Sequence, residues 1–87
     1  LFAEAVTLHQ RGDLNAAEVR YRQVLGLQPG HPDALHHLGL IAYAAGLLDE
    51  AAGHIGESLR RKPANAAAHA NLALVHHARG DYAGALE

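Results

Sequence analysis

The sequence contains no cysteine, no methionine and no tryptophan, and only one phenylalanine and three tyrosines among its 87 residues. The absence of cysteine excludes disulfide bonds, thiolate metal sites and cysteine nucleophiles. No apolar run approaches the roughly 20 residues that span a bilayer, and no signal peptide is recognisable, so we expect no membrane partner and a cytoplasmic location. Because even an initiating methionine is absent, we expect the chain to be a piece of a longer protein.

Basic side chains are also scarce. Seven Lys and Arg stand against nine Asp and Glu, which gives a formal charge of −2. Binding to phosphates requires an excess of basic side chains on one face, so nucleic acid is not an expected partner.

Alanine and leucine dominate what is present. Nineteen Ala and 14 Leu compare with only six Val and Ile together. Ala and Leu have the highest helix propensities, whereas β-branched residues favour strands. No segment alternates polar and apolar residues over a sustained length, so the fold is predicted to be all-α.

Equivalent residues return after 34 positions. Gly12, Gly46 and Gly80 are separated by this interval. The same interval relates these further residues: Ala17, Ala51 and Ala85; Leu25 and Leu59; Pro29 and Pro63; Leu38 and Leu72; and Leu14, Leu48 and Tyr82. A period of this length indicates a stack of similar supersecondary units.

Each period divides into two helices. Between Pro32 and Gly46, apolar residues recur at steps of three and four, as one face of a helix requires: Leu35, Leu38, Ala42 and Ala45. The corresponding patterns predict helices over about 1–11, 14–27, 32–45, 49–61 and 66–79, and another beginning at 82. The helix over 49–61 contains Gly53 and Gly56, each of which costs roughly 1 kcal/mol relative to Ala.

The predicted helix ends have their own signals. Pro32 suits the first position of a helix, and the recurring glycines provide the left-handed backbone that ends one. Asp13, Asn65 and Asp81 are predicted N-caps. Leu47 has no polar side chain at the corresponding position, which is why the next helix is expected to start at Asp49.

These residues resemble the tetratricopeptide repeat, and the resemblance covers the whole chain. In the middle period it rests on the Leu38-Gly39 pair, Gly46, Ala51 and Pro63. The resemblance implies a right-handed superhelix of antiparallel helix pairs with about two and a half repeats, over 1–31, 32–65 and 66–87.

The chain departs from the family at the bulky positions. Small or polar residues stand where the family often has Trp (Leu1, Leu35 and His69) or Tyr (Leu8, Ala42 and His76). Smaller side chains bury less area, so we expect a light core. His69 and His76 are expected to fill core positions as neutral rings.

The resemblance also implies a concave groove, lined by the first helix of each repeat, that binds a protein or peptide. Its positions correspond to Phe2, Val6, His9, His36, His37, Leu40, Tyr43, Ala70, Asn71, Leu74 and His77, with Gln10, Asp33, Ala44 and Ala67 beside them. Family members that clamp the carboxylate tails of chaperones use Lys, Arg and Asn there. Only Asn71 agrees with that set, so a tail clamp is not expected.

Eight histidines are the compositional exception. None is three or four residues from another, the spacing at which two rings on a helix share a zinc ion. Glu50, His54 and Glu57 have helical spacing, but a solvated face is the favoured interpretation, and no metal or cofactor is predicted. Neither Ser58 nor Thr7 has the His and carboxylate partners of a nucleophile, so we expect no enzyme activity.

Three functions remain. A non-catalytic protein-binding module is the leading hypothesis. A weaker resemblance, around His69–Ala73 and over 30–40, is to the repeats of bacterial O-linked N-acetylglucosamine transferases, in which Asn at the position of Asn71 grips substrate backbones. It implies a substrate-recruiting region of a larger glycosyltransferase. The third function is a structural element that self-associates through its uncapped terminal helices.

Overall fold

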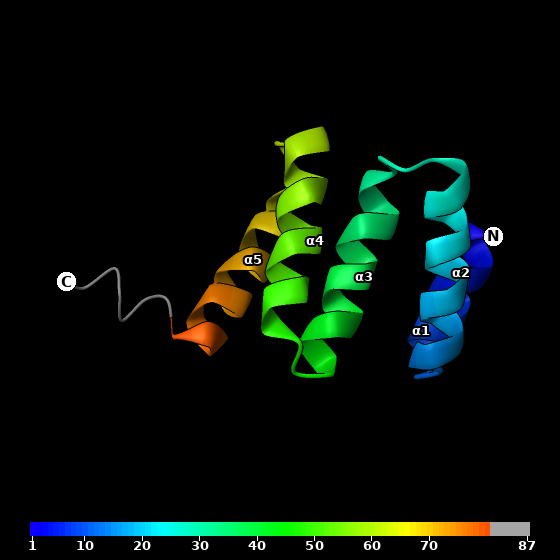
Figure 1. Cartoon of the computed structure of the whole chain (residues 1–87), viewed down its shortest axis with the longest axis horizontal. Helices are drawn as coiled ribbons and strands as arrows, with labels where there is room; N and C mark the ends of the chain where they lie inside the picture. Colours follow the sequence, from blue (N-terminus) through cyan, green and yellow to red (C-terminus); the bar gives the residue numbers. More distant parts are fainter. Residues whose placement is uncertain (81–87) are drawn as a thin grey trace.

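The chain forms a row of helices in the computed structural model (Figure 1), which describes residues 1–80. Within that range it has no strand, and its helices are α1 (Phe2–Gln10), α2 (Leu14–Leu27), α3 (Pro32–Ala44), α4 (Leu48–Arg61) and α5 (Ala66–Arg79). Loops of three or four residues join them, so consecutive helices run antiparallel. The all-α prediction is confirmed. The predicted Asp81 cap and the helix from 82 lie outside the described residues.

Glycine ends the first helix of each pair, as predicted. Gly12, Gly46 and Gly80 have φ values of 85°, 78° and 81°, which side chains with a Cβ rarely adopt. After α3, the Leu47 N–H donates to the Ala42 carbonyl at 2.9 Å, which satisfies a carbonyl that the helix leaves free. The chain therefore reverses at the same point in the first two repeats, after α1 and after α3.

The helix starts agree only in part with the predicted caps. The Asn65 side chain accepts a hydrogen bond from the Ala68 N–H at 3.1 Å, which confirms it as the cap of α5. Asp13 is the N-cap residue of α2, as predicted, but its side chain makes no capping hydrogen bond. His31 caps α3 instead of a residue of the usual kind, because its Nδ1 accepts from the Ala34 N–H at 3.1 Å. Helix α4 begins at Leu48, one residue before the predicted start.

Two apolar clusters form the core. The first joins α1, α2 and α3 through these buried residues: Ala5, Ala17, Tyr21, Val24, Ala34, Leu38 and Ile41. The second joins α3, α4 and α5 through Ala42, Ala51, Ile55, Leu59, Ala68 and Val75. Helix α3 contributes to both clusters and so connects one helix pair to the next. None of the described helices has both the length and the apolar character needed to cross a bilayer.

The core contains few large side chains, as expected, but not all of the bulky positions named in the sequence analysis are buried in it. Leu35 and Ala42 are buried, with exposed fractions of 6% and 7%, whereas Leu1 is 53% exposed. His69 is exposed, contrary to the prediction that it fills the core, because its Nε2 lies 2.7 Å from the Pro63 carbonyl and holds the ring at the surface. Ala45 was also expected on the buried face; it is exposed because it follows the end of α3.

Helices α3 and α4 approach closely at Gly39. A Cβ added there would lie 2.4 Å from Ile55 Cγ1 and 3.2 Å from the Ala51 carbonyl oxygen. The buried Ser58 hydroxyl donates to the Pro32 carbonyl at 2.8 Å and ties the other end of the same pair. The Leu-Gly pair of the sequence motif is therefore the contact that lets these two helices pack.

Two glycine substitutions are expected to have opposite effects. Gly39→Ala should lower the free energy of unfolding by about 1–3 kcal/mol, because the new methyl group overpacks the contact with Ile55. Gly53→Ala should raise it by about 1 kcal/mol, because nothing lies within 4 Å of the added Cβ and Ala is the better helix former. Urea unfolding followed by circular dichroism measures both; a loss of stability at Gly53 or none at Gly39 would contradict this packing.

Candidate functional site

The residues predicted to bind a partner lie on three helices. Phe2, Val6 and His9 are on α1; His36, His37, Leu40 and Tyr43 are on α3; and Ala70, Asn71, Leu74 and His77 are on α5. We call these eleven residues the groove face. The structure divides them into rings packed between α1 and α3, a hydrogen-bonded pair between α3 and α5, and exposed side chains on α3 and α5.

Six rings cluster between α1, α2 and α3, and His37 is at their centre. The His37 ring stacks on Tyr21 with centroids 5.3 Å apart and planes 5° apart. The ring of His9 meets it edge-on at 5.5 Å, and Phe2 lies 5.8 Å away. We call this the ring cluster; its members are Phe2, His9, Tyr21, His31, His36 and His37.

Two members of the ring cluster were not predicted as site residues. Tyr21 was expected only in the apolar stripe of its helix, and it is fully buried. Its hydroxyl is hydrogen-bonded to His9 Nδ1 at 3.2 Å, and this bond orients the His9 ring, which belongs to the groove face. His31 caps α3, and its ring lies 4.9 Å from that of Phe2 with the two planes tilted by 36°. The spacing of rings along single helices gives no sign of these contacts, because they join three different helices.

Burial sets the charge of the ring cluster. It lowers the pKa of His9, His36 and His37 below the ordinary value of 6.5. His37 is lowered further by the neighbouring His36 and His9, while Asp33 acts in the opposite direction. Burial raises the pKa of Tyr21 to about 12. These four groups are therefore uncharged at neutral pH.

One ring nitrogen in the cluster is unsatisfied. His37 Nδ1 is buried and has no hydrogen-bond partner among the described residues. A buried polar atom of this kind costs free energy, typically 1–3 kcal/mol. The packing of the rings around His37 outweighs that cost.

His36 and Asn71 connect the two repeats across the groove face. Asn71 Nδ2 donates to His36 Nε2 at 2.8 Å, and the two residues are 35 positions apart. His36 is 8% exposed, so its neutral ring is the acceptor. The amide was expected to be directed at a partner. One of its N–H groups is bonded to His36 and holds α5 against α3, and the carbonyl oxygen and the second N–H are not used in that bond.

The exposed part of the groove face is apolar. Tyr43 and Leu74 are 38% and 54% exposed. Leu40, three residues before Tyr43 on α3, is half-buried. Ala70 and His77 are also exposed. Exposed apolar side chains gathered on one face, with polar groups around them, are characteristic of interaction surfaces.

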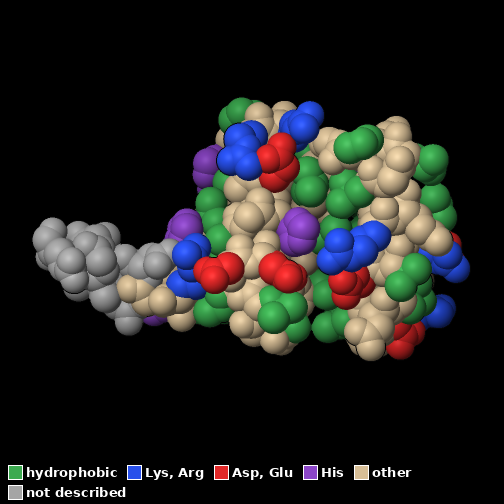
Figure 2. All heavy atoms as spheres, in the orientation of Figure 1, with side chains coloured by type: hydrophobic (Ala, Val, Ile, Leu, Met, Phe, Trp, Pro, Cys, Tyr) green, Lys and Arg blue, Asp and Glu red, His purple; other side chains and the backbone are tan. Residues whose placement is uncertain are grey.

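Charged side chains lie elsewhere. Figure 2 shows them over the face formed by α2 and α4. The ion pairs of the described residues are Arg20–Glu4, Arg22–Glu18, Arg60–Glu57, Arg61–Glu57 and Arg79–Asp49. No Lys or Arg stands at any of the eleven positions of the groove face, and Asp33 is the one carboxylate predicted beside them.

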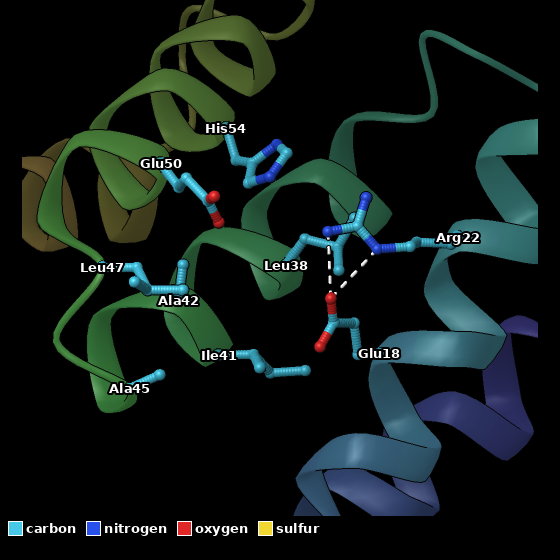
Figure 3. Close-up of a pocket in the computed structure, with 9 residues that line it drawn as sticks. All are labelled: Glu18, Arg22, Leu38, Ile41, Ala42, Ala45, Leu47, Glu50 and His54. Atoms are coloured by element: carbon cyan, nitrogen blue, oxygen red, sulfur yellow. Dashed lines mark hydrogen bonds and ion pairs between the residues drawn. The ribbon is translucent and has the colours of Figure 1, made fainter.

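The histidine and carboxylates on α4 do not converge on a metal site. Glu57 is paired with Arg60 and Arg61, whose hydrogen bonds hold the pKa of its carboxyl below the usual value. Glu50 and His54 instead face Arg22 and Glu18 on α2 (Figure 3). Within residues 1–80, no three ligating side chains are placed to hold one ion.

Comparisons with known families agree with the repeat pattern. A tetratricopeptide repeat model matches residues 8–55, and a second tetratricopeptide repeat model matches residues 49–87. No curated protein matches the chain. The first match alone covers more than half of the 87 residues.

The ring cluster makes stability depend on pH. An unfolded histidine takes up a proton near pH 6.5, whereas His9, His36 and His37 take theirs up at lower pH in the folded chain. The unfolded state therefore binds more protons as the pH falls below about 6.5. The free energy of unfolding should decrease from pH 7 to pH 5, measured as a falling urea midpoint.

His37→Phe should weaken this pH dependence, because it removes a ring whose pKa is lowered by burial and by its neighbours His36 and His9, and it keeps an aromatic partner for Tyr21. His69→Gln, at an exposed position, is the matched control and should leave the profile unchanged. Identical profiles for His37→Phe and the parent chain would show that the ring cluster is not responsible.

Proposed function

Because the chain belongs to the tetratricopeptide repeat family, whose repeats generally mediate protein–protein interaction without catalysing a reaction, we propose that its groove face binds an extended peptide segment of a partner protein. The segment lies across α1, α3 and α5. It places apolar side chains on α3 and α5 and backbone groups beside Asn71.

Exposed apolar area is the observation that carries this proposal. Tyr43 and Leu74 keep 38% and 54% of their surface exposed, and both belong to the groove face. A peptide that covers them removes apolar surface from water, worth about 25 cal/mol per Å2. Tyrosine is also among the residues that most often dominate binding energy at interfaces.

Asn71 adds a hydrogen-bonding group beside the apolar side chains. One N–H of its amide is used by His36, which leaves the carbonyl oxygen and the second N–H as acceptor and donor. A peptide backbone presents both complementary groups at each residue. Because His36 holds the amide in place, little side-chain entropy is lost when a peptide binds.

The same face disfavours an acidic ligand. Its eleven positions offer no Lys or Arg, and burial keeps His9, His36 and His37 neutral at pH 7. A carboxylate placed there would lose its water without gaining a cation. The expected ligand is therefore apolar, with little negative charge.

Two other roles stay predictions. A substrate-recruiting region of a glycosyltransferase depends on Asn71 as a backbone-gripping residue, and its bond to His36 fixes the amide on the groove face, as that role requires. A self-associating structural element is favoured by an apolar hollow at the α1–α2 end of the chain, where Leu1 and Leu27 are 53% and 75% exposed.

Selection from a library of random dodecapeptides against the full chain tests the binding proposal. The selected peptides should be enriched in apolar residues and poor in Asp and Glu. Tyr43→Ala should weaken binding of a selected peptide at least tenfold, which corresponds to about 1.4 kcal/mol, measured by fluorescence anisotropy.

Val19→Ala is the matched control, since Val19 is 54% exposed but lies on α2, outside the groove face. It should leave the affinity unchanged. Equal losses for Tyr43→Ala and Val19→Ala, or selected peptides rich in acidic residues, would contradict binding at the groove face.

A further inference from the structure

A second hollow lies between α2, α3 and α4, away from the groove face. It is lined by Glu18, Arg22, Leu38, Ile41, Ala42, Ala45, Leu47, Glu50 and His54, none of which belongs to the eleven residues of that face. Figure 3 shows side chains from all three helices directed around one space. Here α4 of one repeat meets α2 of the preceding one.

The floor of this hollow is apolar. Leu38, Ile41 and Ala42 form it, with exposed fractions of 2%, 7% and 7%. These residues belong to the core and are held by packing on both sides. The floor is therefore rigid, and a group that enters meets methyl and methylene surface.

The rim carries more negative than positive charge. Arg22 bonds to Glu18 through Nε at 3.0 Å and a terminal nitrogen at 2.9 Å, and both bonds end on the same carboxylate oxygen, Oε2. The second oxygen of Glu18 is thus not used by Arg22. Glu50 is exposed on the α4 side of the hollow. Two carboxylates therefore stand against a single guanidinium.

His54 does not add a positive charge to the rim. Burial lowers the pKa of its ring, and the positive charge of Arg22 lowers it further, while Glu50 and Glu18 act in the opposite direction. These influences also show that Arg22, Glu18 and Glu50 all lie near the same ring. A neutral imidazole leaves the net negative charge of the rim unchanged at pH 7.

We propose that this hollow binds the end of a lysine side chain from a partner protein, with the ammonium group between Glu18 and Glu50 and the adjoining methylene groups on Leu38, Ile41 and Ala42. An alkylammonium group matches both features, since it joins an apolar stem to a compact cation. An anion would face the two carboxylates, and the guanidinium that could attract it is already bonded to Glu18.

The volume of the hollow also favours the end of a lysine side chain. It holds about 40 Å3 of free space, enough for a few heavy atoms, because a single water needs roughly 10–15 Å3. A planar ring or a guanidinium fork is larger than the end of a lysine side chain. The hollow therefore fits a chain that enters end-on.

Two small ligands that differ in charge test the proposal. Nα-acetyl-lysine methylamide should shift the backbone amide resonances of Leu38, Ala42 and His54 in a saturable way when it is titrated into the full chain at pH 7. Its Nε-acetylated counterpart keeps the stem but has no charge, and it should cause no saturable shift at these residues. Raising the salt concentration should weaken the binding.

Variants at Glu50 test whether binding of the lysine ligand depends on the carboxylates at the rim of the hollow. Glu50→Gln should weaken binding of the lysine ligand about two- to fivefold, as expected for one partly exposed ion pair, and Glu50→Lys should abolish it. Glu4→Gln is the matched control, because Glu4 is a half-exposed carboxylate on α1 that pairs with Arg20. Circular dichroism confirms that each variant is folded.

Three results would overturn the proposal. They are equal binding of the two ligands, equal affinity for the Glu50→Gln variant and the parent chain, and the absence of any saturable shift at the hollow. Competition between a lysine-containing protein fragment and the small ligand would support a partner protein as the source of the lysine side chain. A free alkylamine that binds at least tenfold more tightly than any such fragment contradicts that source.

Discussion

Contacts between small side chains determine how closely the helices of this chain approach one another. Each of the five described helices contributes one alanine with no exposed surface: Ala5, Ala17, Ala34, Ala51 and Ala68. Four of these are spaced at 17 residues, half of the repeat. At Gly39 even a methyl group has no room. The close approach lets a core with few bulky side chains exclude water, because packing at short range replaces the area that large residues would bury.

The two faces of the helix row differ in chemistry as a consequence. Aromatic and imidazole rings pack together where α1, α2 and α3 meet, and burial lowers the pKa of His9, His36 and His37 there. The His36–Asn71 bond continues this face onto α5. Away from the groove face, Glu18 and Arg22 of α2 and Glu50 of α4 lie around a hollow with an apolar floor. We propose that one face binds apolar peptide segments and that the other binds a single cationic side chain.

Much of the fold could be predicted from the sequence because its constraints are local and recur. The turn glycines were predicted to end helices with a left-handed backbone, and Gly12, Gly46 and Gly80 all have it. Ala17 and Ala51 recur at the repeat interval and are both fully buried, and Ala34 and Ala68 repeat the same interval. Asp13 shows the limit of such reasoning, because a capping residue at the right position makes no side-chain bond.

The site was harder to predict because its contacts join residues that are distant in sequence. The stacking of His37 on Tyr21 depends on how α3 crosses α2, and His31 and His69 each bond to backbone groups, which residue spacing does not reveal. The hollow forms only where α4 meets α2. Helix periodicity assigns a residue to a face of its own helix, but the partner of that face depends on tertiary packing.

The most direct test of the packing account is a comparison of three alanine-to-leucine variants by urea unfolding. Ala34→Leu and Ala51→Leu place a larger side chain at fully buried contacts, and each should lower the free energy of unfolding by about 1–3 kcal/mol. Ala16→Leu, at an exposed position of α2, should change it by less than about 0.5 kcal/mol. Equal stabilities for all three variants would contradict the claim that small side chains set the distance between these helices.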